Sequence, residues 1–138
     1  MRTQDNLIKA NQLAKERDTY GFHVFSKTTN TCTIAGSKDL IYYHNLELIF
    51  VDPVFLKGRF DFQINPETDF ISELSSSEIK QLKLSSALQY PLKGFRISSS
   101  DGDDVILVAQ ALEVGTDTVY YYPKENLGSS ERLAPWVK

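Results

Sequence analysis

Hydrophobic and polar residues alternate with a period of two through much of the chain, and this period predicts β-strands. The clearest case lies within residues 54–64, where Leu56, Phe60 and Phe62 share one parity while charged and amide side chains take the other. A strand with one buried and one solvated face is expected there. In all, strands are predicted over residues 20–26, 30–35, 40–51, 54–64, 94–99, 104–114 and 118–122.

Turn-forming residues separate these runs. The segments 35–39, 52–53 and 101–102 combine Gly, Asp and Pro, which favour tight turns. Connections this short join antiparallel strands, because parallel neighbours need a long crossover. The tail, residues 125–138, is predicted to be irregular, with Trp136 anchoring it to the body of the protein.

Helical spacing appears before the first predicted strand. Within residues 5–18, Leu7, Ala10 and Ala14 fall on one face, and Gly21 follows the end of the pattern. This apolar face is narrow, so the helix needs a sheet to pack against.

A second helix is predicted over about residues 75–89. Ser75 and Glu78 have the spacing of a capping box, and Leu74 and Ile79 occupy the positions of a hydrophobic staple. The two signals indicate the same helix start.

These elements predict a single α+β domain over residues 1–138. We expect a curved antiparallel sheet of about seven strands, with the N-terminal helix and the helix at about 75–89 packed on one face. The 138 residues include 41% hydrophobic and 24% charged residues, which is typical of a globular protein with one core.

The charge of the chain restricts its partners. A net charge of -3 disfavours nucleic acid and anionic membranes, which are bound mainly through Lys and Arg. The sequence has no apolar stretch long enough for a signal or a membrane span, and Cys32 is its only cysteine. A soluble cytoplasmic protein is therefore expected.

Two polar residues interrupt the apolar run at residues 41–53. Simple alternation places His44 on the face of Leu46 and Leu48, with Glu47 on the opposite face, so they are not expected to form an acid–base pair unless a bulge intervenes. His44 then either ends a core stripe with its ring nitrogens satisfied or binds a ligand together with Tyr42.

The sequence contains no established motif for metal, nucleotide or nucleophilic chemistry. His23 is predicted to face solvent and Cys32 to be a small buried residue, and no paired ligand spacing involves either. No metal or cofactor is expected, and catalysis is not favoured.

Two clusters are candidates for binding a partner protein. Asp101, Asp103 and Asp104 lie at a predicted hairpin tip and could meet a basic partner. In the predicted strand 118–122, either Tyr120 and Tyr122 point outward or the reverse, and exposed tyrosines are good interface anchors.

Together these features favour a small protein-binding module of an immunity, inhibitor or scaffold type. In overall type it resembles the immunity proteins of bacterial toxin systems, a likeness carried by no residue motif. The alternative is a small-molecule binder with a pocket between sheet and helices, near Tyr42 and His44. Assembly into a homo-oligomer stays open.

Overall fold

The computed structural model describes residues 3–84 and 92–138 and confirms the predicted α+β class. Most neighbouring strands run antiparallel, as the short turns predicted. The helices and strands of these residues are α1 (Thr3–Arg17), β1 (Gly21–Lys27), β2 (Thr31–Ser37), β3 (Tyr43–His44), β4 (Leu46–Val51), β5 (Phe55–Lys57), β6 (Asp61–Gln63), β7 (Ile71–Glu73), α2 (Ser76–Gln81), β8 (Lys93–Ile97), β9 (Val105–Ala109), β10 (Ala111–Gly115), β11 (Thr118–Tyr120) and β12 (Glu131–Leu133).

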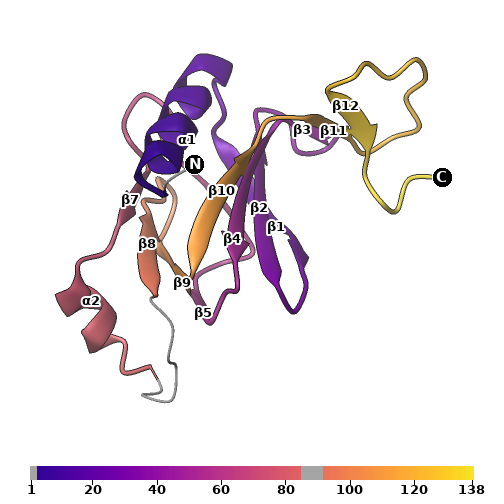
Figure 1. The fold of residues 1–138 in the computed structure, drawn as a ribbon. Helices are drawn as coiled ribbons and strands as arrows, with labels where there is room; N and C mark the ends of the chain where they lie inside the picture. Colours follow the sequence, from indigo (N-terminus) through magenta and orange to yellow (C-terminus); the bar gives the residue numbers. More distant parts are fainter. Residues whose placement is uncertain (1–2, 85–91) are drawn as a thin grey trace.

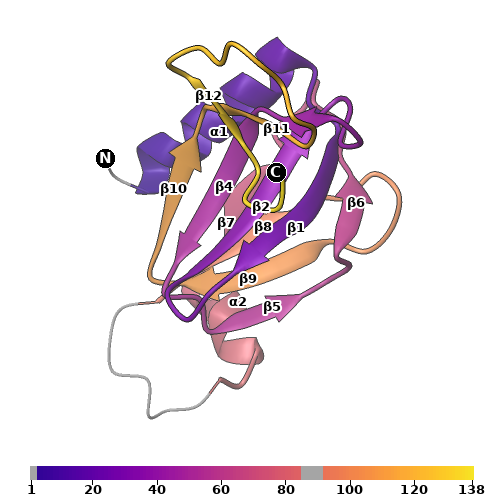
Figure 2. The ribbon, with the colours of Figure 1, turned by 90° about the vertical axis from the view of Figure 1, so that its right-hand side faces the viewer.

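The strands form three sheets instead of one curved sheet (Figure 1). A five-stranded sheet has the order β10-β4-β2-β1-β6, and a four-stranded sheet has the order β5-β9-β8-β7. Figure 2 shows β5 and β9 crossing behind the larger sheet. A small sheet, β12-β11-β3, lies at one end of the larger sheet, and its β11–β12 pair is parallel.

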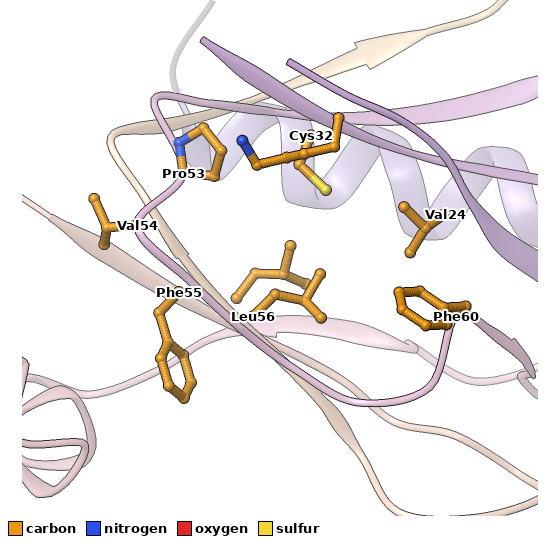
Figure 3. A pocket seen from close by; sticks show the side chains of 9 residues that line it. Val24, Cys32, Pro53, Val54, Phe55, Leu56 and Phe60 are labelled. Atoms are coloured by element: carbon orange, nitrogen blue, oxygen red, sulfur yellow. The ribbon is translucent and has the colours of Figure 1, made fainter. Parts of the chain in front are cut away.

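The core lies between the two larger sheets. Phe50 of β4 meets Phe95 of β8 edge to face, with ring centres 5.4 Å apart. Phe22 of β1 stacks on Phe62 of β6 at 5.8 Å. All these rings are buried, and each contributes about 1.5–3 kcal/mol by leaving water. An open pocket lies between the layers, lined by residues that include Cys32 and Leu107, the strand partners of Phe50 and Phe95 (Figure 3).

Helix α1 packs with its predicted apolar face inward. Leu7, Ala10 and Ala14 are buried, and the two alanines let the helix backbone approach the sheets closely. Asn6, which is also buried, donates a hydrogen bond from Nδ2 to the carbonyl of Leu112 in β10, at 2.7 Å. The helix therefore lies across the β10 side of the fold (Figure 1).

Helix α2 begins where predicted but is shorter than predicted. Ser75 accepts from the N–H of Glu78, and the Glu78 side chain accepts from the N–H of Ser75, which completes the capping box. The helix ends at Gln81, and Lys83 has a left-handed φ of 55°. Residues 85–89 of the predicted helix lie outside the described part of the chain. Neither described helix has the length and apolar character needed to cross a membrane.

Local breaks account for most differences from the predicted strands. The predicted strand 40–51 divides at Asn45, and the predicted strand 104–114 divides at Gln110. The predicted strand 54–64 also divides, around Gly58 with its φ of 150°, into β5 and β6. Phe60, predicted on the buried face with Phe62, is 79% exposed, so the predicted single buried face is wrong there. Each of the three breaks lets one run of residues contribute to two sheets, which a simple period of two does not reveal. The sequence also missed two strands of three residues, β7 and β12, because each is too short to show a period.

We predict that Gly36→Ala destabilises the protein by about 1–3 kcal/mol, because the added methyl group would overpack the core. Gly36 pairs with Phe22, and a Cβ at position 36 would lie 2.4 Å from the Phe22 ring. The control is Gly21→Ala in β1, whose Cβ would meet its nearest atom at an ordinary 3.4 Å. Urea unfolding measures both variants, and equal midpoints would contradict this account of Gly36.

Candidate functional site

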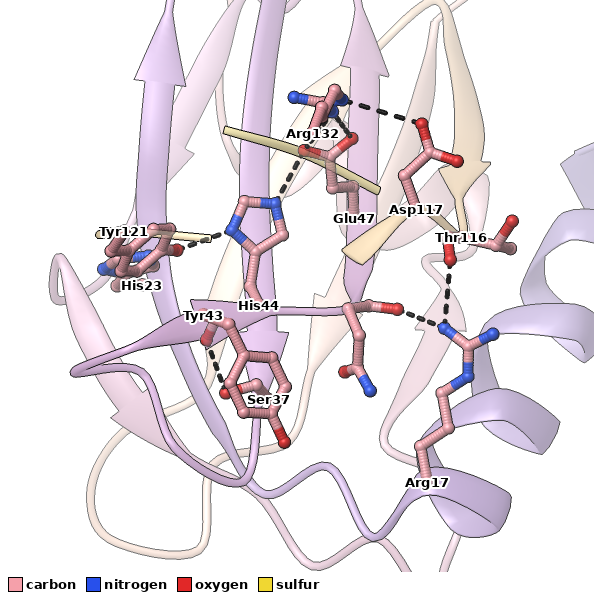
Figure 4. A network of polar contacts seen from close by, with 11 residues as sticks. Arg17, His23, Ser37, Tyr43, His44, Glu47, Thr116, Asp117, Tyr121 and Arg132 are labelled. Carbon is pink, nitrogen blue, oxygen red and sulfur yellow. Dashed lines mark hydrogen bonds and ion pairs between the residues drawn. The ribbon is translucent and has the colours of Figure 1, made fainter. Parts of the chain in front are cut away.

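A fully buried histidine lies where the small sheet meets the five-stranded sheet. The His44 side chain is 0% exposed, and both of its ring nitrogens have partners. Nδ1 lies 2.5 Å from the hydroxyl of Tyr121, and Nε2 lies 2.8 Å from Oε2 of Glu47 (Figure 4). Its ring nitrogens are thus satisfied by side chains of this chain.

The prediction that His44 and Glu47 lie on opposite faces is wrong. Alternation is interrupted at Asn45, whose N–H donates to the carbonyl of Gly36 at 3.1 Å. The Asn45 carbonyl accepts from the guanidinium of Arg17 at the end of α1. Because β3 belongs to one sheet and β4 to another, the parity of the side chains resets between them.

The hydrogen-bonded chain continues on both sides of the His44–Glu47 pair. Nε2 of His23, in β1, lies 2.9 Å from the Tyr121 hydroxyl. Arg132, in β12, donates to both carboxylate oxygens of Glu47 at 3.0 Å. Its Nε lies 3.6 Å from Asp117. His23 was predicted to face solvent, but it is half-buried and belongs to this hydrogen-bonded network.

One assignment of protons is consistent with every hydrogen bond of this network. An ionised Glu47 accepts from Nε2–H of His44, which leaves Nδ1 to accept from the Tyr121 hydroxyl. The oxygen of Tyr121 then accepts from Nε2–H of His23. In this assignment His23 donates to Tyr121, Tyr121 donates to His44, and His44 donates to the Glu47 carboxylate.

The environment supports these protonation states. Burial alone would raise the pKa of Glu47, but hydrogen bonds from His44 and Arg132, together with the positive charge of Arg132, outweigh it and lower the pKa. Burial, helped by the negative charge of Glu47, raises the pKa of Tyr121 well above its usual value. The carboxyl group is therefore held ionised and the phenol protonated.

The Glu47 carboxylate also requires a glycine on the neighbouring strand. Gly115 in β10 pairs directly with Glu47, and a Cβ at position 115 would lie 2.8 Å from Glu47 Oε1. The missing side chain leaves the space that the carboxylate occupies.

Aromatic rings cover the same face of the five-stranded sheet. Phe25 of β1 lies edge-on to the His44 ring, with the centres 4.6 Å apart. Trp136 lies 5.4 Å from Phe25 and 5.3 Å from Tyr121, although it is 55% exposed. The tail therefore packs on this face through Trp136, the residue predicted as its anchor.

On the other side of β3 and β11, four tyrosines form a group that we call the tyrosine surface. Tyr121 points inward with Val119, so Tyr120 and Tyr122 point outward, the first of the two predicted arrangements. Tyr42 is 55% exposed and Tyr122 is 42% exposed. The four members are Tyr42, Tyr43, Tyr120 and Tyr122, and together with Asp39 they line a shallow depression of about 480 Å³.

The rings of the tyrosine surface contact one another. Tyr42 meets Tyr122 edge to face at 6.3 Å, and Tyr120 meets Tyr122 at 5.6 Å. Segments far apart in the sequence are joined here by backbone pairing, since Tyr43 lies opposite Tyr120. The structure thus unites Tyr42, predicted as a ligand contact, with the two tyrosines predicted to bind a partner.

The predicted acidic cluster is largely engaged within the chain. Asp101 accepts from the backbone N–H of Gln63, the Ser99 hydroxyl and Arg59, and these contacts lower its pKa to about 2. Asp104 pairs with Arg96 at 3.4 Å. Asp103 is exposed, and no described side chain forms an ion pair with it. The aspartates lie on the β8–β9 connection, outside the tyrosine surface.

The order hydroxyl, imidazole, carboxylate in Tyr121, His44 and Glu47 is that of a nucleophilic catalytic triad. Here the imidazole is enclosed, and the hydroxyl is held between His44 and His23. These hydrogen bonds therefore join the small sheet to the five-stranded sheet and support the placement of one on the other. Within residues 3–84 and 92–138, no three His, Cys, Asp or Glu side chains gather as metal ligands.

Comparison of the chain with protein-family models, with curated proteins and with solved structures finds no match. The roles of these residues therefore rest on their geometry.

We predict that Tyr121→Phe lowers the free energy of unfolding by about 1–3 kcal/mol, because it leaves Nδ1 of the buried His44 and Nε2 of the half-buried His23 without their partner. The matched control is Tyr122→Phe, which removes the same atom from an exposed neighbour. Urea unfolding compares the two variants. Equal effects would show that the buried hydroxyl contributes no more than an exposed one.

A second prediction concerns how the free energy of unfolding depends on pH. Burial, with the nearby His44, lowers the pKa of His23 below 6.5, although Asp61 opposes this. As the pH falls through 6.5, the unfolded chain binds a proton at His23 before the folded chain does, so the folded state loses stability. Between about pH 8 and about pH 5, the wild type should therefore lose more unfolding free energy than His23→Gln. Parallel pH profiles would contradict this prediction.

Proposed function

We propose that the chain is a protein-binding module of the inhibitor, immunity or scaffold type, and that its partner docks on the tyrosine surface. The observation that supports this most directly is the exposure of Tyr42 and Tyr122, together with the adjacent Ile41, which is 78% exposed. Tyrosine is enriched among the residues that dominate binding energy at interfaces. A cluster of exposed large side chains on a folded domain marks an interaction site.

The surface is supported from beneath. Tyr121 lies between Tyr120 and Tyr122 in the sequence and is bonded on the inner side to His44 and His23. Backbone pairing of β3 with β11 fixes the other side of the group. Side chains held in place before binding lose less conformational entropy on binding, which favours affinity.

The charges around the tyrosine surface favour a basic partner. Asp39 lines the depression, and no described side chain forms an ion pair with its carboxylate. Lys124 already shows how the surface accepts a cation, since its Nζ lies 5.0 Å from the centre of the Tyr120 ring and 3.4 Å from Glu131. A partner Arg or Lys between Tyr42 and Asp39 would repeat this arrangement of ring face and carboxylate.

The structure offers less support for the alternative of a ligand pocket at Tyr42 and His44. His44 has both ring nitrogens occupied and no exposed surface. Tyr42 belongs to the open tyrosine surface. Protein binding is therefore the function that this part of the structure supports best.

The test uses a photo-reactive phenylalanine analogue in place of Tyr122 to cross-link the partner from extracts of the native host. The identified partner is then purified and its affinity measured. We predict that Tyr42→Ala and Tyr122→Ala each weaken binding about 5- to 30-fold, as expected for interface anchors worth 1–2 kcal/mol.

The matched control is Tyr20→Ala, which removes a tyrosine of similar exposure, 41%, from outside the tyrosine surface. Asp103→Ala tests the hairpin tip in the same assay. Normal affinity of both tyrosine variants would overturn the proposed surface, and selective loss in Asp103→Ala would move the interface to the β8–β9 connection.

A further inference from the structure

An open pocket of about 320 Å³ lies between the two larger sheets, at the edge of the core (Figure 3). Its walls include Val24 and Cys32 from the five-stranded sheet and Leu56 and Leu107 from the four-stranded sheet. Phe60 stands at its edge and is 79% exposed. An apolar hollow that reaches an exposed aromatic ring is typical of a small-molecule site.

The cavity has a clear structural cause. Across the five-stranded sheet Cys32 pairs with Phe50, and across the four-stranded sheet Phe95 lies in register with Leu107. The Phe50–Phe95 pair fills the gap between the layers at one point of this row. On the neighbouring strands, the small Cys32 side chain lies beside Phe50, and the aliphatic Leu107 lies beside Phe95. These two smaller side chains leave the space that the pocket occupies.

Cys32 adds to the apolar character of this wall. Its side chain is buried, and burial raises the pKa of its thiol even though Lys27 opposes this. A neutral thiol behaves as a small apolar group.

One charged side chain lines the cavity, and a bulge places it there. The β1–β2 register shifts between Val24 and Ser26, so Lys27 pairs directly with Cys32. Residues directly opposite in an antiparallel pair point to the same face, which brings Lys27 to the face of Cys32. Its ammonium donates to the neighbouring Thr28 carbonyl, and no described carboxylate forms an ion pair with it.

From this geometry we propose a second binding site, for an apolar monocarboxylate such as a medium-chain fatty acid. The apolar body lies between Cys32, Leu56 and Leu107, and the carboxylate meets the ammonium of Lys27. The volume sets the size of the ligand. A cavity of about 150 Å³ holds benzene, so about twice that volume suits a chain of about ten carbons. This site is independent of the tyrosine surface, with which it shares no residue.

The probe is decanoate, with decanol as the uncharged control, followed by amide chemical shifts in the ¹⁵N-labelled protein. We predict saturable shifts at Val24, Lys27 and Leu56, with the Tyr122 amide unmoved. Lys27→Met, at an exposed position, should weaken decanoate binding at least about fivefold and leave decanol binding unchanged, because only the charged contact is lost.

Two further variants complete the test. Lys38→Met removes another exposed lysine outside the cavity and should leave decanoate binding unchanged. Cys32→Leu fills the cavity and should abolish binding of both probes, with its folding checked by the same spectra. Absence of saturable shifts, or equal weakening of decanoate and decanol in Lys27→Met, would overturn the proposal.

A third outcome separates this site from the protein-binding function. If decanoate does not bind while Cys32→Leu abolishes capture of the partner protein, the cavity accepts a partner side chain and the fatty-acid proposal is wrong. If decanoate binds as predicted while the tyrosine variants retain partner affinity, the proposed function fails and this inference stands.

Discussion

The placement of the small sheet on the five-stranded sheet depends on one imidazole ring that is hydrogen-bonded at both nitrogens. His44 is enclosed between the Tyr121 hydroxyl and the Glu47 carboxylate, and these partners come from segments on either side of the sheet junction. Removing either partner would leave a buried polar group unsatisfied, which costs more than the hydrogen bond itself contributes in a folded protein. The low-dielectric surroundings make this a strong constraint on how the small sheet sits, because few other placements satisfy all the groups at once.

This constraint explains how the outer surface is organised. Strand alternation places Tyr120 and Tyr122 on one side once Tyr121 is fixed on the other. Apolar contacts from Trp136 and Phe25 reinforce the junction but could slide more easily than directional hydrogen bonds. The hydrogen bonds of Tyr121 therefore determine which tyrosines reach solvent, and they also limit the movement of Tyr120 and Tyr122 on either side of it. A surface of this kind differs from a flexible loop because its geometry is set before any partner arrives.

Much of the fold could be predicted from local pattern. The face of α1 followed from Leu7, Ala10 and Ala14, and the start of α2 followed from the capping box at Ser75, because both signals involve neighbours within one or two helical turns. The buried polar chain could not be predicted, since the contact between His44 and Tyr121 joins residues 77 positions apart. The face of Glu47 was predicted wrongly for a different reason. A single interruption at Asn45 reverses parity, and one asparagine within an apolar run does not by itself show that a strand divides there.

The two sites share this physical origin. At Asn45 the break turns Glu47 toward His44 and creates the buried chain beneath the tyrosines. At Phe25 the register shift turns Lys27 toward the face of Cys32 and supplies a cation to an otherwise apolar cavity. A regular strand would have sent each of these charges to the opposite face. In this protein the regular part of the β pattern builds the core, whereas its one-residue irregularities put polar groups where they can bind, and this explains why period alone predicted the fold better than the sites.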